Sequence, residues 1–115
     1  MKNETAFFVA CGSDSENLDT IKYLLDRGAD INKENIVKDT LLYCACYNGC
    51  ENVIKFLVEN GTDIHHQNRE NETPLYSTCE SDAANYYIVK YLIERGSDIN
   101  EKNRSGETPL YKACL

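Results

Sequence analysis

The chain has 115 residues, which suits a single domain, and 42% of them are hydrophobic, enough to build a core. Acidic side chains outnumber basic ones by 19 to 12, so the net charge is -7. Because nucleic acids are bound through basic surfaces, this charge argues against a nucleic-acid partner. An excess of negative charge keeps a protein soluble, and it also favours a basic protein partner.

Membrane and export signals are missing from the sequence. No stretch approaches the roughly 20 apolar residues that a membrane-spanning helix needs. The apolar run of residues 6–11 is too short for the core of a signal peptide, and Glu4 stands where positive charge is expected. We therefore expect an intracellular, cytoplasmic protein with no membrane partner.

The sequence repeats itself along its whole length. Gly28, Gly61 and Gly96 lie 33 and 35 residues apart, and each is followed two residues later by aspartate, three later by isoleucine and seven later by asparagine. So many matches in one register indicate tandem structural units. Four threonines follow the same spacing: Thr5, Thr40, Thr73 and Thr108.

The sequence of each unit predicts two helices and a turn. The first helix begins after the threonine, whose hydroxyl can cap free backbone N–H groups, and Pro74 and Pro109 take the first helical position in two units. The second helix, as in residues 53–58, is apolar around most of its circumference, which is typical of a helix packed between neighbours. The glycine then ends this helix in a left-handed conformation. Since no unit can bury its surfaces alone, the units must stack.

These motifs resemble the ankyrin repeat. The family signature Thr-Pro-Leu-His-x-Ala is matched by residues 108–113, which read Thr-Pro-Leu-Tyr-Lys-Ala, by residues 73–76, and more weakly by residues 40–45 and 5–8. The family's Leu-Leu-x-x-Gly-Ala-Asp-x-Asn is matched by residues 24–32 and 92–100. The resemblance implies an all-α solenoid of helix-turn-helix units with short hairpin-like connectors, forming one domain over residues 1–115. The expected repeats are residues 1–35, 36–68, 69–103 and a partial repeat, 104–115.

Three features depart from the family pattern. Tyrosine replaces the signature histidine in three units and Phe8 replaces it in the first, so these side chains must pack or form hydrogen bonds differently. Two extra residues lie between the helices of the first and third units, at residues 13–17 and 81–85. The turn glycine is kept as Gly106, but it is Asn71 in one unit and Lys38 in another. Because lysine tolerates a positive φ poorly, we expect the Lys38 hairpin to differ from the usual shape.

The fourth unit has no second helix before Leu115. We expect either a piece of a longer array or a partial repeat that serves as a cap. The helix that begins at Thr108 exposes apolar surface in this arrangement, so we expect it to fray or to pair two chains, giving a monomer or a weak dimer.

The cysteines and histidines are candidates for chemistry. Four cysteines stand six residues after a repeat threonine, where the family has a small buried residue, and we expect core thiols. Cys44 and Cys46 face different directions on a helix and cannot easily share a metal ion. His65 and His66 are adjacent in a connector, and we expect both in solvent. The four in-register cysteines are Cys11, Cys46, Cys79 and Cys114.

No catalytic motif is present in the sequence, neither a nucleophile elbow nor a glycine-rich phosphate loop. We therefore expect no enzymatic activity, no cofactor and no metal.

The resemblance implies that a partner protein binds to the hairpin tips and to the exposed side of the first helices, so we predict a protein–protein interaction module or scaffold. Tyr47 has the chemistry of an interface anchor. Ile36 and Val37 could instead tuck against the neighbouring unit. The predicted tip residues are Ile36, Val37, Lys38, Arg69, Glu70 and Arg104. The predicted groove residues are Tyr47, Asn48, Ser77, Glu80, Ser81 and Lys112.

Two alternatives remain open. The array could be a structural spacer within a longer multidomain protein. It could also be the substrate of an asparagine hydroxylase, because Asn32 and Asn100 resemble asparagines that such enzymes modify in ankyrin proteins. In the structural interpretation, these two asparagines bridge backbone groups in the turn.

Overall fold

A computed structural model describes residues 16–81 and 86–114 of the chain. The described residues form helices and no strand, so the all-α prediction is confirmed. The predicted helix after Thr5 and most of the two predicted insertions, at 13–17 and 81–85, lie outside the described residues. The helices are α2 (Glu16–Asp26), α3 (Leu41–Asn48), α4 (Glu51–Glu59), α5 (Pro74–Glu80), α6 (Tyr86–Glu94) and α7 (Pro109–Ala113).

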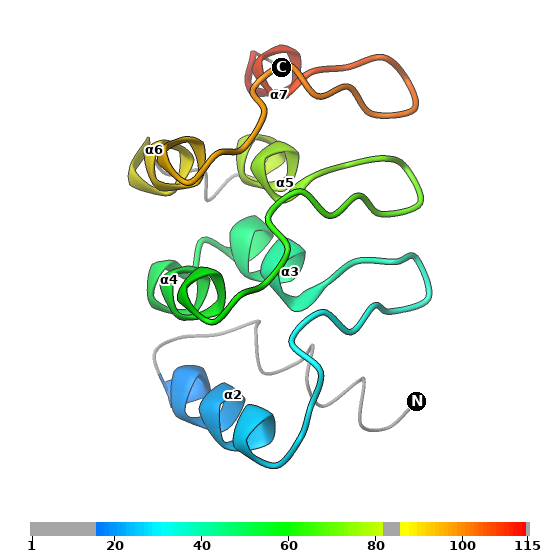
Figure 1. Ribbon diagram of the computed structural model, residues 1–115. Coiled ribbons are helices and arrows are strands. Elements are labelled where there is room, and N and C mark those ends of the chain that lie inside the picture. The colour runs from blue at the N-terminus through cyan, green and yellow to red at the C-terminus, as the bar shows by residue number, and fades with distance from the viewer. Residues whose placement is uncertain (1–15, 82–85, 115) are drawn as a thin grey trace.

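The helices lie in two parallel rows (Figure 1). The second helices of the units, α2, α4 and α6, form one row, and the first helices, α3, α5 and α7, form the other. Contacts join α3 to α5 and α5 to α7 within a row, and α3 to α4 and α5 to α6 within a unit. Three loops project from the same side of the stack beyond the first helices (Figure 1). The result is an elongated molecule of 38 × 27 × 23 Å.

Local chemistry sets the ends of the helices, as the sequence predicts. The hydroxyl oxygen of Thr73 accepts a hydrogen bond from the Tyr76 N–H at 3.2 Å and so caps α5. Thr40 and Thr108 cap α3 and α7 in the same way. After α2, α4 and α6, the chain turns at Gly28, Gly61 and Gly96, whose φ angles are 103°, 90° and 104°. These positive angles are easy only for glycine, which explains why the glycines recur in register.

The core lies between the two rows and between successive units. Leu42, Ile54, Leu57, Leu75 and Leu92 are each at most 2% exposed. The small Ala45 and the thiol of Cys46 are fully buried in α3, and a small side chain at these positions suits closely packed first helices. Burial raises the pKa of Cys46 to about 12, so it stays a neutral thiol.

The in-register cysteines differ along the stack. Cys46 is buried, as predicted, but Cys79 is only half-buried and Cys114 is exposed. The prediction of a core thiol is therefore wrong for Cys114 and only partly right for Cys79, because no described helix covers the far side of α7. Cys11 lies outside the described residues.

Candidate protein-binding surface

An asparagine at the base of each loop holds the loop in a hairpin. The side-chain oxygen of Asn35 accepts hydrogen bonds from the N–H groups of Val37 and Asp39, at 3.1 and 2.9 Å. Asn68 and Asn103 make the two equivalent bonds in their own loops. Because these bonds lie within one loop, they stabilise the hairpin without any contact from a neighbouring unit.

The three hairpins have one shape, so the prediction of a different Lys38 hairpin is wrong. Lys38 adopts a φ of 66°, close to the 59° of Asn71 and the 80° of Gly106. The N–H of Lys38 donates to the Asn35 carbonyl at 2.9 Å. In the equivalent bonds of the other two hairpins, the N–H groups of Asn71 and Gly106 donate to the carbonyls of Asn68 and Asn103. The two side-chain bonds of Asn35 hold Lys38 in a conformation that costs a non-glycine residue about 1 kcal/mol.

The hairpins are joined edge to edge. The N–H of Arg69 donates to the Val37 carbonyl at 3.1 Å, and the N–H of Arg104 donates to the Glu70 carbonyl at 2.9 Å. The tip side chains face solvent, and Ile36 is 77% exposed, so the alternative in which it tucks against the neighbouring unit is wrong. Arg104 differs from the other tip residues because its guanidinium donates to the Arg69 carbonyl.

Two of the three tyrosines that replace the signature histidine link successive units. The hydroxyl of Tyr43 donates to Glu72 of the next unit at 2.9 Å, and that of Tyr76 donates to Glu107 at 3.1 Å. Each glutamate immediately precedes a capping threonine. Asn103 also donates to Glu107, at 3.0 Å, and these two hydrogen bonds lower the pKa of the Glu107 carboxyl. Tyrosine is long enough to reach the neighbouring unit, and how these bonds differ from those of the family's histidine stays a prediction.

Carboxylates gather around the hydroxyl of Tyr43, where the hairpins meet the first helices. Glu72 and Glu80 share the Tyr43 hydroxyl, at 2.9 and 3.5 Å, and Asp39 lies close to both. Partial burial, and then repulsion by Glu72, raises the pKa of both Asp39 and Glu80. Lys112 is 3.9 Å from Glu80 and offsets part of this charge. Asn68 donates hydrogen bonds to Asp39 at 2.7 Å and to Glu72 at 3.2 Å, so two of the three carboxylates of this acidic cluster also have an amide partner.

The other predicted groove residues fall into two groups. Tyr47 is 50% exposed at the end of α3, beside exposed Asn48. Ser77 and Ser81 were expected in the groove, and that prediction is wrong because both are buried. The Ser77 hydroxyl donates to the Tyr43 carbonyl at 2.9 Å, and the Ser81 hydroxyl donates to the Tyr47 carbonyl. Both serines thus tie α5 to α3.

Sequence reasoning missed the carboxylates of this acidic cluster other than Glu80. A signal for them exists, since Asp39, Glu72 and Glu107 each stand one residue before a repeat threonine. A tyrosine three residues after the same threonine completes the pattern. Only the stacked structure shows that the tyrosine of one unit reaches the acid of the next.

The two connector asparagines differ in their surroundings. The side-chain oxygen of Asn32 accepts hydrogen bonds from the Thr62 hydroxyl at 3.2 Å and from the Asp63 N–H at 3.0 Å. It therefore joins two units, whereas the structural interpretation expected it to bridge backbone groups within its own turn; there the side chain of Asp30 accepts the bond, from the Asn32 N–H at 2.9 Å. Asn100 is exposed, and the described residues do not include the equivalents, one unit further on, of the Thr62 and Asp63 that bind Asn32.

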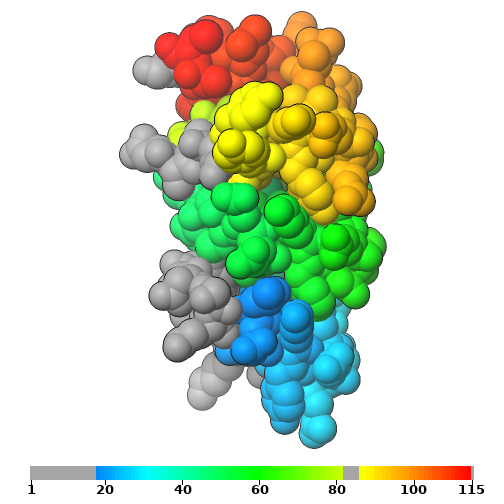
Figure 2. Space-filling model, turned by 90° about the vertical axis from the view of Figure 1, so that its left-hand side faces the viewer, coloured from blue at the N-terminus to red at the C-terminus, as the bar shows by residue number. Residues whose placement is uncertain are grey.

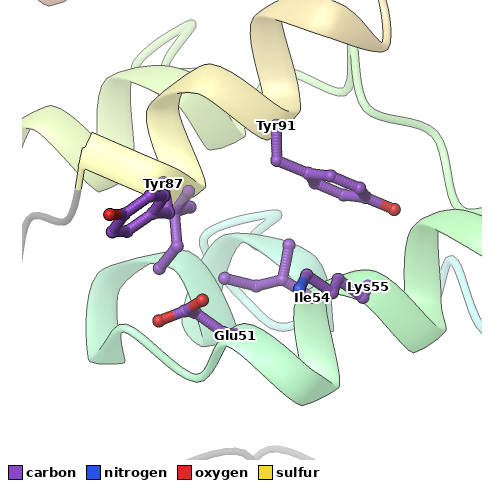
Figure 3. Close-up of a pocket in the computed structure, with 6 residues that line it drawn as sticks. Glu51, Ile54, Lys55, Tyr87 and Tyr91 are labelled. Carbon is purple, nitrogen blue, oxygen red and sulfur yellow. The ribbon is translucent and has the colours of Figure 1, made fainter.

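A small pocket lies on the second-helix side of the stack. Between α4 and α6 lies a pocket of about 10 Å³, lined by Ile54, Lys55, Tyr87 and Tyr91 among others (Figure 3). A space of that size holds about one water molecule. Among the described residues, the buried hydroxyl of Tyr91 has no hydrogen-bond partner. This pocket is too small to be a ligand site.

Metal-ligating side chains do not cluster in the described part of the chain in any group of three or more. His65 is exposed as expected, but His66 is partly buried, so that expectation is wrong for His66. Its Nε2 lies 2.9 Å from a carboxylate oxygen of Glu34 and 2.9 Å from the Lys38 carbonyl. His66 thereby joins two connectors rather than facing solvent.

Stacked helix pairs with projecting hairpins define a helical repeat solenoid. The family model for ankyrin repeats (3 copies) matches residues 1–68 and 42–115, so the chain belongs to the ankyrin repeat family. Ankyrin repeats generally mediate protein–protein interaction, and the family is typically non-enzymatic. The comparison with curated proteins finds no match. None of the described helices is long and apolar enough to cross a bilayer.

Proposed function

We propose that this chain is a non-enzymatic binding module whose groove, between the hairpins and the first helices, holds a basic segment of a partner protein. The observation that carries the proposal is the carboxylate cluster of Asp39, Glu72 and Glu80 at the groove base. A lysine or arginine of a partner would supply the positive charge that Lys112 supplies only in part.

Tyr47 extends this surface with an apolar contact. It is half-exposed at the end of α3, and the hydroxyl of Tyr43, from the same helix, joins the acidic cluster. An exposed tyrosine on the helix whose Tyr43 contacts the acidic cluster suits a peptide that carries both basic and apolar side chains. The free cysteines of the described residues also fit a reducing, intracellular compartment.

The substitution Glu80→Gln should weaken partner binding but raise the stability of the fold. The folded pKa of Glu80 lies above its ordinary value, so its ionised form opposes folding at neutral pH and the penalty is relieved as the pH falls through the raised pKa. The carboxyl is partly exposed and screened, so we expect the variant to be more stable at pH 7 by on the order of a few tenths of a kcal/mol. Below the ordinary pKa of glutamate, the difference should vanish. Urea denaturation at both pH values measures it.

The binding test is a selection from a random-peptide phage library. We expect the enriched peptides to be rich in lysine and arginine, and to bind Glu80→Gln about two- to fivefold more weakly, the effect of one partly exposed ion pair. Tyr47→Ala should weaken binding by about 2 kcal/mol, roughly 30-fold. Glu59→Gln is the matched control, because it makes the same charge change on the exposed side of α4. Neutral or acidic peptides, or unchanged affinity for the Glu80 and Tyr47 variants, would refute the proposal.

The alternatives have different outcomes. A structural spacer would enrich no specific peptide. An asparagine-hydroxylase substrate would gain the mass of one oxygen on incubation with such an enzyme, and Asn100 should react before Asn32, whose side chain is engaged by the next unit.

A further inference from the structure

The joint between the second and third units is hydrogen-bonded on one side. On the first-helix side, the Ser77 and Ser81 hydroxyls tie α5 to α3. Figure 2 faces the opposite, second-helix side, where α4 (green) lies between α2 (blue) and α6 (yellow). There, no hydrogen bond, ion pair or cation–π contact joins residues 53–67 to residues 88–102 in the described part of the chain.

The preceding joint shows which contacts are missing. Its second-helix side is held by Asn32, whose side-chain oxygen accepts hydrogen bonds from the Thr62 hydroxyl and the Asp63 N–H. The Lys22 ammonium lies over the Phe56 ring, 5.4 Å from the ring centroid. Both interactions cross from the unit of α2 to the unit of α4. The second-helix side is therefore held by polar contacts at one joint and not at the next.

The sequence register explains why the hydrogen bond is lost. His65 stands at the position of Asn32 in the next connector, and it is exposed. Both connectors make the same turn, in which the N–H of this residue donates to the aspartate two residues earlier at 2.9 Å. Ser97 stands at the position of Thr62, and its hydroxyl is buried with no hydrogen-bond partner among the described residues. An unpartnered buried hydroxyl costs free energy, so it weakens the closed joint.

A second buried hydroxyl is unpartnered at the same joint. Tyr91 of α6 stands at the position of Phe56, and it lines the small pocket between α4 and α6 (Figure 3). Its hydroxyl and that of Ser97 are the two buried side-chain polar atoms without a partner among the described residues. The cation over the Tyr91 ring, at 4.8 Å, is Arg95 of the same helix rather than a lysine of the preceding one. Closing this joint therefore leaves two polar groups without hydrogen bonds.

We propose that the stack hinges at this joint: α6 and its connector separate from α4 while the serine bonds keep α5 on α3. Opening lets water reach the Tyr91 and Ser97 hydroxyls, which then gain the hydrogen bonds that the closed joint does not provide. Ile88 and Leu92 are buried in the closed joint, so the open form is a minority. Because the pivot lies at the first helices, opening curves the stack toward its hairpins. The hinge stands independently of the proposed basic partner.

Native-state hydrogen exchange detects this opening. The N–H groups of Thr62 and Ser97 make the same local bond, to the Leu57 and Leu92 carbonyls at 3.1 Å. A helix of nine residues is unstable alone, so α6 loses its protection when it separates. We expect the Ser97 amide to exchange at least about tenfold faster than the Thr62 amide, while the Ser77 amide of the same unit stays slow. Equal protection of Ser97 and Ser77, or fast exchange of both, would overturn the proposal, since the joint would be closed or the whole unit would fray.

Variants at two equivalent positions make the test specific. His65→Asn supplies the missing acceptor and should slow exchange of the Ser97 amide about fivefold to tenfold, the effect of one regained hydrogen bond. His65→Ala is the matched control, because it removes the imidazole without supplying an acceptor, and should leave this rate unchanged. The reverse substitution, Asn32→His, should accelerate exchange of the Thr62 amide and leave that of Ser97 unchanged. Equal effects of the two His65 variants, or an unchanged Thr62 amide in Asn32→His, would also overturn the proposal.

Discussion

The segments 73–76 and 108–111 have the same sequence, Thr-Pro-Leu-Tyr, and the same local structure. In each, the threonine oxygen accepts a hydrogen bond from the tyrosine N–H at 3.2 Å. Yet Leu75 and Tyr76 are both 2% exposed, whereas Leu110 and Tyr111 are 72% and 52% exposed. The difference arises because α5 lies between α3 and α7, while α7 has a described first helix on one side only. The local sequence determines the helix, and the neighbouring units determine its burial.

The largest expected difference in the free energy of unfolding is between substitutions of Leu75 and Leu110. Leu75→Ala should lower the free energy of unfolding by about 2–4 kcal/mol, because it removes buried methyl groups and leaves a cavity between α5 and its neighbours. Leu110→Ala should cost less than about 0.5 kcal/mol, as for other exposed positions. Urea denaturation of both variants measures the contrast. Equal losses would mean that α7 is as well packed in solution as α5.

The two tyrosines give a smaller contrast. Tyr76→Phe removes the hydrogen bond to Glu107, which joins the third and fourth units, and should cost about 1–2 kcal/mol. Tyr111→Phe is the matched control, because the Tyr111 hydroxyl has no hydrogen-bond partner among the described residues and its loss should have no measurable effect. If the two variants have the same stability, the tyrosine–glutamate link does not hold the units together.

Substitutions in the hairpins should change the free energy of unfolding least, and they should raise it rather than lower it. Lys38→Gly should stabilise the protein by about 0.5–1 kcal/mol, because glycine adopts the φ of 66° without steric cost. Asn71→Gly should gain less, since asparagine tolerates this conformation better than lysine. Thermal denaturation of both variants tests this order. A destabilised Lys38→Gly would show that the lysine side chain contributes contacts that outweigh its strained backbone.

The features that the sequence predicts correctly are those with a local cause. The threonine caps and the helix ends at Gly28, Gly61 and Gly96 follow from residues within one unit. The shape of the Lys38 hairpin was mispredicted although its cause is also local, because the two hydrogen bonds of Asn35 were not weighed against the preference of lysine.

The candidate site was harder to predict because it depends on contacts between units. Ser77 and Ser81 were placed in the groove, but the rotation of α5 turns them onto the carbonyls of α3. The carboxylate cluster was missed because Tyr43 and Glu72 meet only after stacking, 29 residues apart in the sequence. Tyr47, Glu80 and Lys112 were placed correctly on an accessible surface, and their role in binding stays a prediction.

Native-state hydrogen exchange tests most directly whether neighbouring units, rather than local sequence, determine the stability of each helix. The Ser77 N–H donates to the Thr73 carbonyl at 3.0 Å, and the Lys112 N–H donates to the Thr108 carbonyl at 3.1 Å, so the two amides make the same local bond. We expect the Ser77 amide to exchange only through global unfolding, and the Lys112 amide to exchange at least about 100-fold faster through local opening of α7. Equal protection of the two amides would contradict the account and would show that α7 is a fully stable cap.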